Sequence, residues 1–144
     1  MAATYDPANI FAKILAGQIP CVRVYEDAVA LAFMDVMPCA EGHTLVIPKK
    51  PARNLLDVAP DDLAALMPIV QKVARAVKAG MAADGLTVQQ FNEGAAGQSV
   101  FHLHFHLLPR WEGVALRAPG GPMAKPEALK RQAEKIAATL RMME

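Results

Sequence analysis

Three of the four histidines in this chain stand at alternate positions of one short segment. They are His102, His104 and His106, and the fourth is His43. Because successive side chains of a β-strand point to opposite faces, this spacing predicts a strand with three imidazoles on one face. The other face would be apolar, formed by Phe101, Leu103, Phe105 and Leu107. We interpret the apolar face as part of a core and the histidine face as the wall of a functional cleft.

Two kinds of chemistry suit such a row of imidazoles: metal binding and attack on phosphorus. On a strand, the Cα atoms of His102 and His106 would lie roughly 13–14 Å apart. Both rings could bind one zinc ion at about 2.1 Å only by crowding His104. Two adjacent histidines with His43 remain an alternative zinc set, but no carboxylate or cysteine near the triad offers an obvious further ligand.

An extended anionic substrate, such as a phosphate chain, fits the row better. Neutral imidazole has an ordinary pKa of about 6.5, so near pH 7 it is a nucleophile without prior deprotonation. It can attack phosphorus, carry the transferred group and then release that group to water. This scheme needs neither a metal nor a cofactor, and we expect none.

Residues 92–99, which read NEGAAGQS, lie just before the histidines. Their backbone N–H groups could form an anion-binding turn, and Gln98 and Ser99 would add side-chain donors. The segment is not a P-loop, because no lysine follows the last glycine. A glycine-containing hairpin turn would look much the same, so only its position beside the histidines favours phosphate binding.

Hydrophobic periodicity predicts the elements that must position these residues. Asp6 and Pro7 resemble a helix N-cap and the first helical position, and Gly17 resembles a residue that ends a helix.

Strands are expected over 21–25, 29–35 and 44–48 as an antiparallel meander, and two further strands over 86–91 and 100–109. A long helix would begin at Pro60 and kink at Pro68, and an amphipathic helix would cover 126–141. Residues 111–125 predict a loop that could act as a flap.

Strands interleaved with two long helices indicate an α+β fold, with a five-stranded antiparallel sheet covered on one side. At 144 residues, 53% of them hydrophobic, the chain is expected to form a single domain over 1–144. Its motif-bearing core would span 9–110, followed by a C-terminal flap and helix over 111–144. The isolated cysteines Cys21 and Cys39 predict free thiols.

Composition and charge exclude several functional classes. The formal net charge is +1, which leaves no basic stripe of the kind that binds nucleic acid. No stretch approaches the roughly 18 apolar residues of a membrane span. The N-terminal residues lack the basic and apolar runs of a signal peptide, so we expect a cytoplasmic protein with no membrane partner.

These motifs together resemble the histidine-triad (HIT) family. The resemblance rests on the triad itself, on Gly97-Gln98-Ser99 before it, and on upstream matches at 10–11, 32–35, 42–49 and 92–94. It covers residues 9 to 110 and looks closest to the bacterial Hint-like branch. It implies a HIT-type fold and a homodimer that joins sheets across a two-fold axis, through the fifth-strand region and the long helix.

The resemblance also implies an activity. The protein would be a hydrolase or transferase that cleaves purine nucleotides at the α-phosphate through a covalent nucleotidyl-histidine. Nucleoside phosphoramidates, such as AMP derivatives, are the favoured substrates, and dinucleoside polyphosphates come next. The alternative is a nucleotide-binding regulatory protein with little turnover.

The family resemblance assigns roles to individual residues. His104 would be the nucleophile, His106 would bind phosphate oxygens, and His102 would orient the other imidazoles. His43 would complete the histidine network, and Ser99 would assist the leaving group. Asp35 would accept the ribose hydroxyls. The implied nucleotide-binding positions are Ile10, Phe11, Phe33, Asp35, Val36, Leu45, Asn92, Gln98, Ser99 and His106.

One feature of some bacterial relatives is missing. Their structural zinc site uses a CxxC motif, a later histidine and the first triad histidine. The corresponding positions here hold Asn9, Ala12 and Pro51, so the resemblance implies no zinc at that place.

Overall fold

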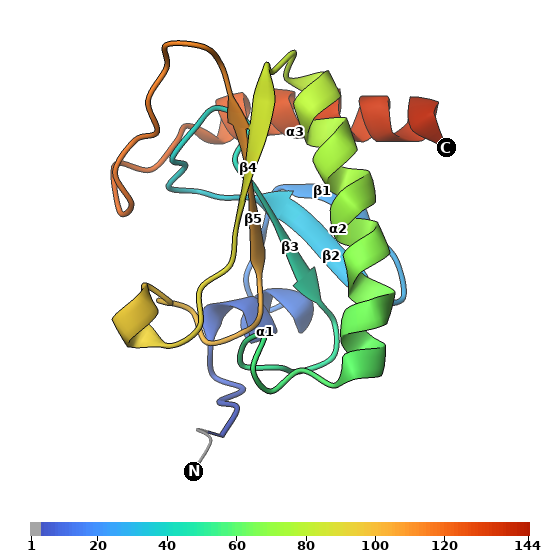
Figure 1. The fold of residues 1–144 in the computed structure, drawn as a ribbon, viewed down its shortest axis with the longest axis vertical. Helices are drawn as coiled ribbons and strands as arrows, with labels where there is room; N and C mark the ends of the chain where they lie inside the picture. Colours follow the sequence, from blue (N-terminus) through green and yellow to red (C-terminus); the bar gives the residue numbers. More distant parts are fainter. Residues whose placement is uncertain (1–3) are drawn as a thin grey trace.

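The computed structural model describes residues 4–144 and contains one five-stranded antiparallel sheet flanked by helices (Figure 1). The strands are β1 (Arg23–Glu26), β2 (Ala30–Met34), β3 (Thr44–Pro48), β4 (Gly85–Gln89) and β5 (Phe105–Arg110). The helices are α1 (Ile10–Leu15), α2 (Pro60–Gly80) and α3 (Pro126–Met143), with a short 3-10 helix η1 (Gly94–Ala96). The α+β class and the five-stranded sheet are confirmed.

The strand order β1-β2-β3-β5-β4 puts the histidine segment inside the sheet. The first three strands are consecutive neighbours, which confirms the meander, while β5 pairs with β3 on one side and β4 on the other. His106 lies opposite Leu45 of β3 and Gln89 of β4. The free edges of the sheet belong to β1 and β4, and the expected homodimer through the fifth-strand region and the long helix stays a prediction.

The two faces of the sheet differ in what covers them. On one face the larger core joins sheet residues to α2 and α3, whose buried positions include the expected Leu129, Ala133, Ile136 and Leu140. On the other face a smaller cluster combines Phe11 of α1 with Leu31, Phe33, Leu45 and Ile47. Figure 1 shows α1 near the end of the sheet opposite α3.

The fifth strand begins later than the sequence suggests. It starts at Phe105, not Val100, so His102 and His104 precede it. The register that pairs Val46 with Phe105 would next pair Ile47 with His104 and Pro48 with Leu103. Pro48 has no N–H to donate, and the N–H of Leu103 bonds instead to the carbonyl of Ala52 at 2.8 Å. The expected alternation survives, because Leu103 and Phe105 enter the larger core.

The first helix also differs at its start. Its N-cap is Asn9, whose side chain accepts a hydrogen bond from the N–H of Ala12 at 2.9 Å. Asp6 instead accepts from the N–H of Ala8 in a preceding turn. Aspartate and asparagine both cap helices well, so the prediction of Asp6 as the N-cap was wrong by three positions. Gly17, with φ of +77°, follows the helix end as predicted.

Residues 111–125 contain no helix or strand, as expected. Two backbone hydrogen bonds connect this segment to residues 36–39. The N–H of Arg117 donates to the carbonyl of Cys39 at 2.8 Å, and the N–H of Ala124 donates to the carbonyl of Val36 at 2.9 Å. Helix α2 continues through Pro68 without a break. Within residues 4–144, none of the helices combines the length and apolar character needed to cross a membrane.

Candidate active site

A cavity of about 410 Å³ lies on the α1 face of the sheet, beside the histidines. Its apolar part includes four residues that were expected to hold a purine, namely Ile10, Phe11, Phe33 and Leu45. Asp35, Val36, Ser99, His104 and His106 also line it. The structure therefore brings most of the predicted site residues to one place. Neither lysine nor arginine occurs among the described lining residues.

His104 carries an unprotonated nitrogen into this cavity. Its Nδ1 lies 2.7 Å from the carbonyl oxygen of His102, and because a carbonyl can only accept, Nδ1 holds the proton. Nε2 makes no hydrogen bond to any described residue. Because every fully buried side-chain nitrogen or oxygen among these residues has a hydrogen-bond partner, the unpartnered Nε2 must be accessible from outside. Its lone pair is therefore free to attack an electrophile.

Burial keeps the His104 ring neutral. Desolvation lowers the pKa of His104, while the hydrogen bond to His102 and the nearby Asp35 carboxylate act in the opposite direction. A ring that is neutral at pH 7 keeps the lone pair that a nucleophile needs. The contacts with the His102 carbonyl and the Asp35 carboxylate also stabilise a positively charged ring, which is the state that forms when Nε2 bonds to phosphorus.

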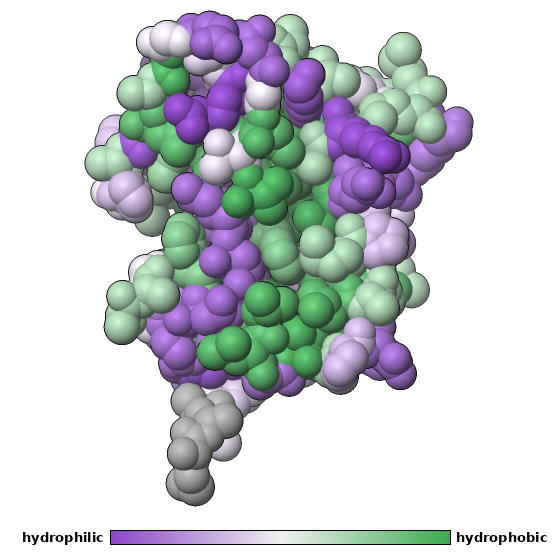
Figure 2. Space-filling view, viewed as in Figure 1, coloured by the Kyte–Doolittle hydropathy of each residue, from purple (hydrophilic) through white to green (hydrophobic). Residues whose placement is uncertain are grey.

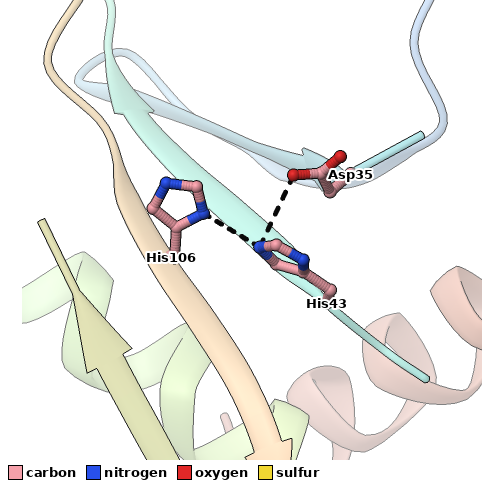
Figure 3. Close-up of side chains that lie close together, drawn as sticks. All are labelled: Asp35, His43 and His106. Carbon is pink, nitrogen blue, oxygen red and sulfur yellow. Dashed lines mark hydrogen bonds and ion pairs between the residues drawn. The ribbon is translucent and has the colours of Figure 1, made fainter. Parts of the chain in front are cut away.

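His43, His106 and Asp35 form a second cluster (Figure 3). The N–H of Cys39 donates to Nδ1 of His43 at 3.0 Å, so the His43 proton is on Nε2. That Nε2 lies 2.9 Å from Nδ1 of His106 and 3.5 Å from a carboxylate oxygen of Asp35. His43 therefore donates to His106, and the proton of His106 must be on Nε2.

Burial also keeps both of these rings neutral at pH 7. Desolvation lowers the pKa of His43 to about 4 and that of His106 to about 3. His106 thus presents a neutral N–H donor at the cavity wall, suited to a phosphate oxygen. The pKa of Asp35 is raised by burial, against the N–H of Met37 that bonds to its carboxylate.

The same three side chains have the spacing of a metal site, with one ligand atom from each lying within 4.8 Å of the others. This corrects the expectation that no carboxylate lies near the triad histidines. The Cys39 contact, however, requires a proton on Nε2 of His43, the atom that faces the other two residues. A metal would have to displace that proton and the Cys39 contact, so we interpret the cluster as a hydrogen-bond network.

His102 lies behind the cavity and does not line it. Its side chain is buried, its Nε2–H donates to the carbonyl of Pro48 at 2.8 Å, and its Nδ1 accepts from the hydroxyl of Tyr5 at 2.6 Å. The backbone carbonyl of His102 is what reaches His104. Sequence reasoning identified neither Tyr5 nor the backbone of Cys39, because no local motif marks them.

The segment before the triad is held by its own polar side chains. The Gln98 carbonyl accepts from Asn54 and from the N–H of Glu93, and its amino group donates to the carbonyls of Arg53 and Val100. All four hydrogen-bonding positions of the Gln98 amide are thereby filled.

The Asn92 side chain bonds in the same way to Leu55 and Gln90. Neither Asn92 nor Gln98 lines the cavity, and their side-chain hydrogen bonds support the loop. The phosphate contacts expected of these two side chains stay a prediction. Ser99, by contrast, does lie at the cavity.

Known proteins resemble this chain over most of its length. The HIT domain family matches residues 16–113. The adenosine 5'-monophosphoramidase hnt1 of Schizosaccharomyces pombe is 36% identical over 135 residues, which make up 92% of this chain and 98% of that protein.

Two solved structures extend the likeness to the fold. A Hit-like protein from Bartonella henselae, described as involved in cell-cycle regulation, has a TM-score of 0.91 and 52% identity over 95% of this chain and 99% of that one. A zinc-bound histidine triad family protein from Mycobacterium smegmatis has a TM-score of 0.81 and 33% identity, with 94% and 95% covered. With the histidine geometry, the family match and these relatives in agreement, the chain belongs to the HIT family.

Proposed function

We propose that this protein hydrolyses purine nucleotide derivatives at the α-phosphate through a covalent intermediate on His104. The observation that carries the proposal is the free Nε2 of a neutral His104 in a cavity with apolar walls. The Nε2 lone pair bonds to phosphorus, and the bond to the leaving group breaks with its electron pair, which takes up a proton through the Ser99 hydroxyl so that a phosphoramidate releases a neutral amine. Water then attacks phosphorus, the P–N bond to His104 breaks, and its pair returns to Nε2. The proton that the water loses replaces the one taken by the leaving group.

Neighbouring groups would assist both steps. The Nε2–H of His106 would donate to a non-bridging oxygen, and the hydroxyl of Ser99 would serve the leaving group; the position of both residues at the cavity supports these roles. The positive charge that forms on the His104 ring is stabilised by the His102 carbonyl and the Asp35 carboxylate. The apolar walls around Phe11 and Phe33 would hold the purine.

The charge of the cavity favours phosphoramidates over dinucleoside polyphosphates. Its two lining histidines, His104 and His106, have pKa values lowered by burial and are neutral at pH 7, and the described lining residues offer no lysine or arginine to offset a polyphosphate leaving group. A phosphoramidate releases an amine and adds no such charge. The name of the Schizosaccharomyces pombe relative, adenosine 5'-monophosphoramidase, supports the same choice.

Steady-state kinetics would test this proposal directly. We expect wild-type protein to turn over an adenosine phosphoramidate with kcat/KM at least about tenfold above that for diadenosine tetraphosphate. The His104→Ala variant should bind AMP and turn over neither. Equal or better cleavage of the tetraphosphate would contradict the substrate class. AMP binding without any wild-type turnover would instead support the regulatory alternative.

We also propose a homodimer, formed through the edge strand β4 and helix α2. Figure 2 shows apolar surface on the face that carries these elements. Exposed apolar side chains of this part of the chain are Val88 of β4, Met67 of α2, and Leu55 and Leu56 in the segment before α2. Light scattering should report a dimer that Val88→Lys converts to a monomer. The control Met142→Lys, at an exposed position of α3, should remain dimeric. A monomeric wild type would refute this assembly.

A further inference from the structure

Tyr5 makes a contact that the proposed mechanism leaves unexplained. Its hydroxyl lies 2.6 Å from Nδ1 of His102, across 97 positions of sequence. The two rings meet edge to face, with centroids 5.6 Å apart. Phe11, from the same N-terminal part of the chain, packs edge-on against His104, with centroids 5.0 Å apart. The residues before and within α1 therefore contact the first two triad histidines directly.

The direction of the Tyr5 hydrogen bond follows from its neighbours. Nε2 of His102 lies 2.8 Å from the carbonyl of Pro48, and because a carbonyl cannot donate, the proton of a neutral His102 is on Nε2. Burial lowers the pKa of His102, which favours the neutral ring. Nδ1 is then a bare acceptor, so the hydroxyl of Tyr5 must donate to it.

We propose that Tyr5 is a positioning residue that fixes His102 and, through the His102 carbonyl, fixes His104 with its proton on Nδ1. Both ring nitrogens of His102 are bonded only while Tyr5 is in place. The His102 carbonyl is the acceptor that holds the His104 proton away from Nε2. This inference rests on the proposed function, since it concerns the nucleophile of that reaction.

Loss of the Tyr5 hydroxyl would act on the chemical step and not on nucleotide binding. The buried Nδ1 of His102 would lose its donor, and the ring would shift to find another partner. Once the His102 carbonyl moves, the His104 proton is free to occupy Nε2, and a ring protonated there cannot attack phosphorus. Tyr5 does not line the cavity, so the apolar walls for the purine would remain.

The test compares the two tyrosines of the chain. We expect Tyr5→Phe to lower kcat for an adenosine phosphoramidate about tenfold, with KM within about twofold of wild type. The matched control is Tyr25→Phe, because the Tyr25 hydroxyl is also bonded, to Asp27 and Lys72, but far along the chain from the triad. It should leave both constants unchanged. Equal kcat for wild type and Tyr5→Phe would overturn the proposal while leaving the proposed function intact.

A spectroscopic measurement covers the case in which the variant folds poorly. In wild-type protein, 15N NMR of the imidazoles should show protonated Nδ1 and bare Nε2 for His104, with the opposite pattern for His102. In Tyr5→Phe, the His104 signals should move toward a mixture of both forms, which a purely structural tyrosine would not cause. A proton on Nδ1 of His102 in wild type would reverse the Tyr5 bond and refute the inference.

Discussion

Residues 102 to 107 present two different regions of the molecule from one stretch of backbone. Leu103, Phe105 and Leu107 enter the larger core with α2 and α3, and Leu103 and Leu107 have no exposed surface. The histidines between them face the other way, and the two at the cavity, His104 and His106, are held by hydrogen bonds. Because successive residues of this stretch point to opposite faces, packing the leucines and Phe105 into the core also directs His104 and His106 toward the cavity.

The two sets of side chains stabilise the protein to different extents. Burying a leucine side chain contributes about 1.5–3 kcal/mol, so the apolar set supports the fold strongly. A buried neutral imidazole loses hydration that its hydrogen bonds only partly restore. Substitutions on the two faces should therefore have separable effects, one on stability and the other on chemistry.

The largest effect should follow removal of the nucleophile. We expect His104→Gln to lower kcat for an adenosine phosphoramidate by at least about 10³-fold, because no other side chain replaces its free nitrogen. The melting temperature should change by only a few degrees, which scanning calorimetry would check. A residual rate within tenfold of wild type would show that the two faces do not divide stability and chemistry in this way.

The opposite signature is expected from Leu107→Ala. Its fully buried side chain lies in the larger core, so its truncation should lower the free energy of unfolding by about 2–5 kcal/mol. The kcat of the protein that remains folded should stay within about twofold of wild type. Urea unfolding and active-site titration measure these two quantities. A large loss of kcat in fully folded protein would contradict the separation.

As pH falls below 6.5, acid should act first on the histidine face. Unfolded histidines bind protons near pH 6.5, whereas folded His43 does so only near pH 4 and His106 near pH 3. Between these values the unfolded chain binds more protons, so the free energy of unfolding should fall as pH decreases from 6.5.

Urea melts at several pH values would measure this slope. The variant His43→Asn should have a shallower slope below pH 6.5, whereas Leu107→Ala should keep that of wild type. A His43→Asn slope equal to wild type would mean that His43 is not held neutral. Because the pKa of His104 is also lowered, the acid limb of kcat/KM should lie below pH 6.5.

A smaller effect is expected at the edge of the cavity. Asp35→Asn keeps the oxygen that accepts from the N–H of Met37 but removes the charge that would bind ribose hydroxyls. We expect KM for the phosphoramidate to rise about tenfold, with the affinity for inorganic phosphate unchanged. Isothermal calorimetry with phosphate provides the comparison. Equal losses for both ligands would remove Asp35 from the ribose role.

Several features could be predicted from the sequence because their causes are local. The period-two alternation predicted the two faces correctly from Leu103 to Leu107, whereas Phe101 lies outside the core and His102 does not line the cavity. The strand over 44–48 has the bounds expected from its apolar run. The buried positions of α3 could be predicted because its apolar residues recur at helical spacing. The family resemblance then placed His104 and Phe11 together, although no local pattern links them.

Other features depend on partners that are distant in sequence. The start of β5 depends on Pro48, the last residue of β3, and on Ala52 in the loop after it, both distant from β5 in the sequence. The carbonyl of Pro48 and the N–H of Cys39 determine which nitrogens of His102 and His43 carry protons, and Tyr5 donates to the remaining nitrogen of His102. Single residues and backbone groups of this kind form no pattern in the sequence. A glutamine amide can donate to phosphate, so the sequence predicted that role for Gln98. In the structure, neighbouring residues fill all hydrogen-bonding positions of this amide.

The central claim is that His104 forms a covalent bond to the nucleotide without a metal. Intact-protein mass spectrometry after rapid mixing with an adenosine phosphoramidate, with EDTA present, tests it most directly. We predict an acid-labile adduct of one AMP group on wild type and none on His104→Gln. Turnover without any adduct, an equal adduct on the variant, or turnover that EDTA abolishes would contradict the account.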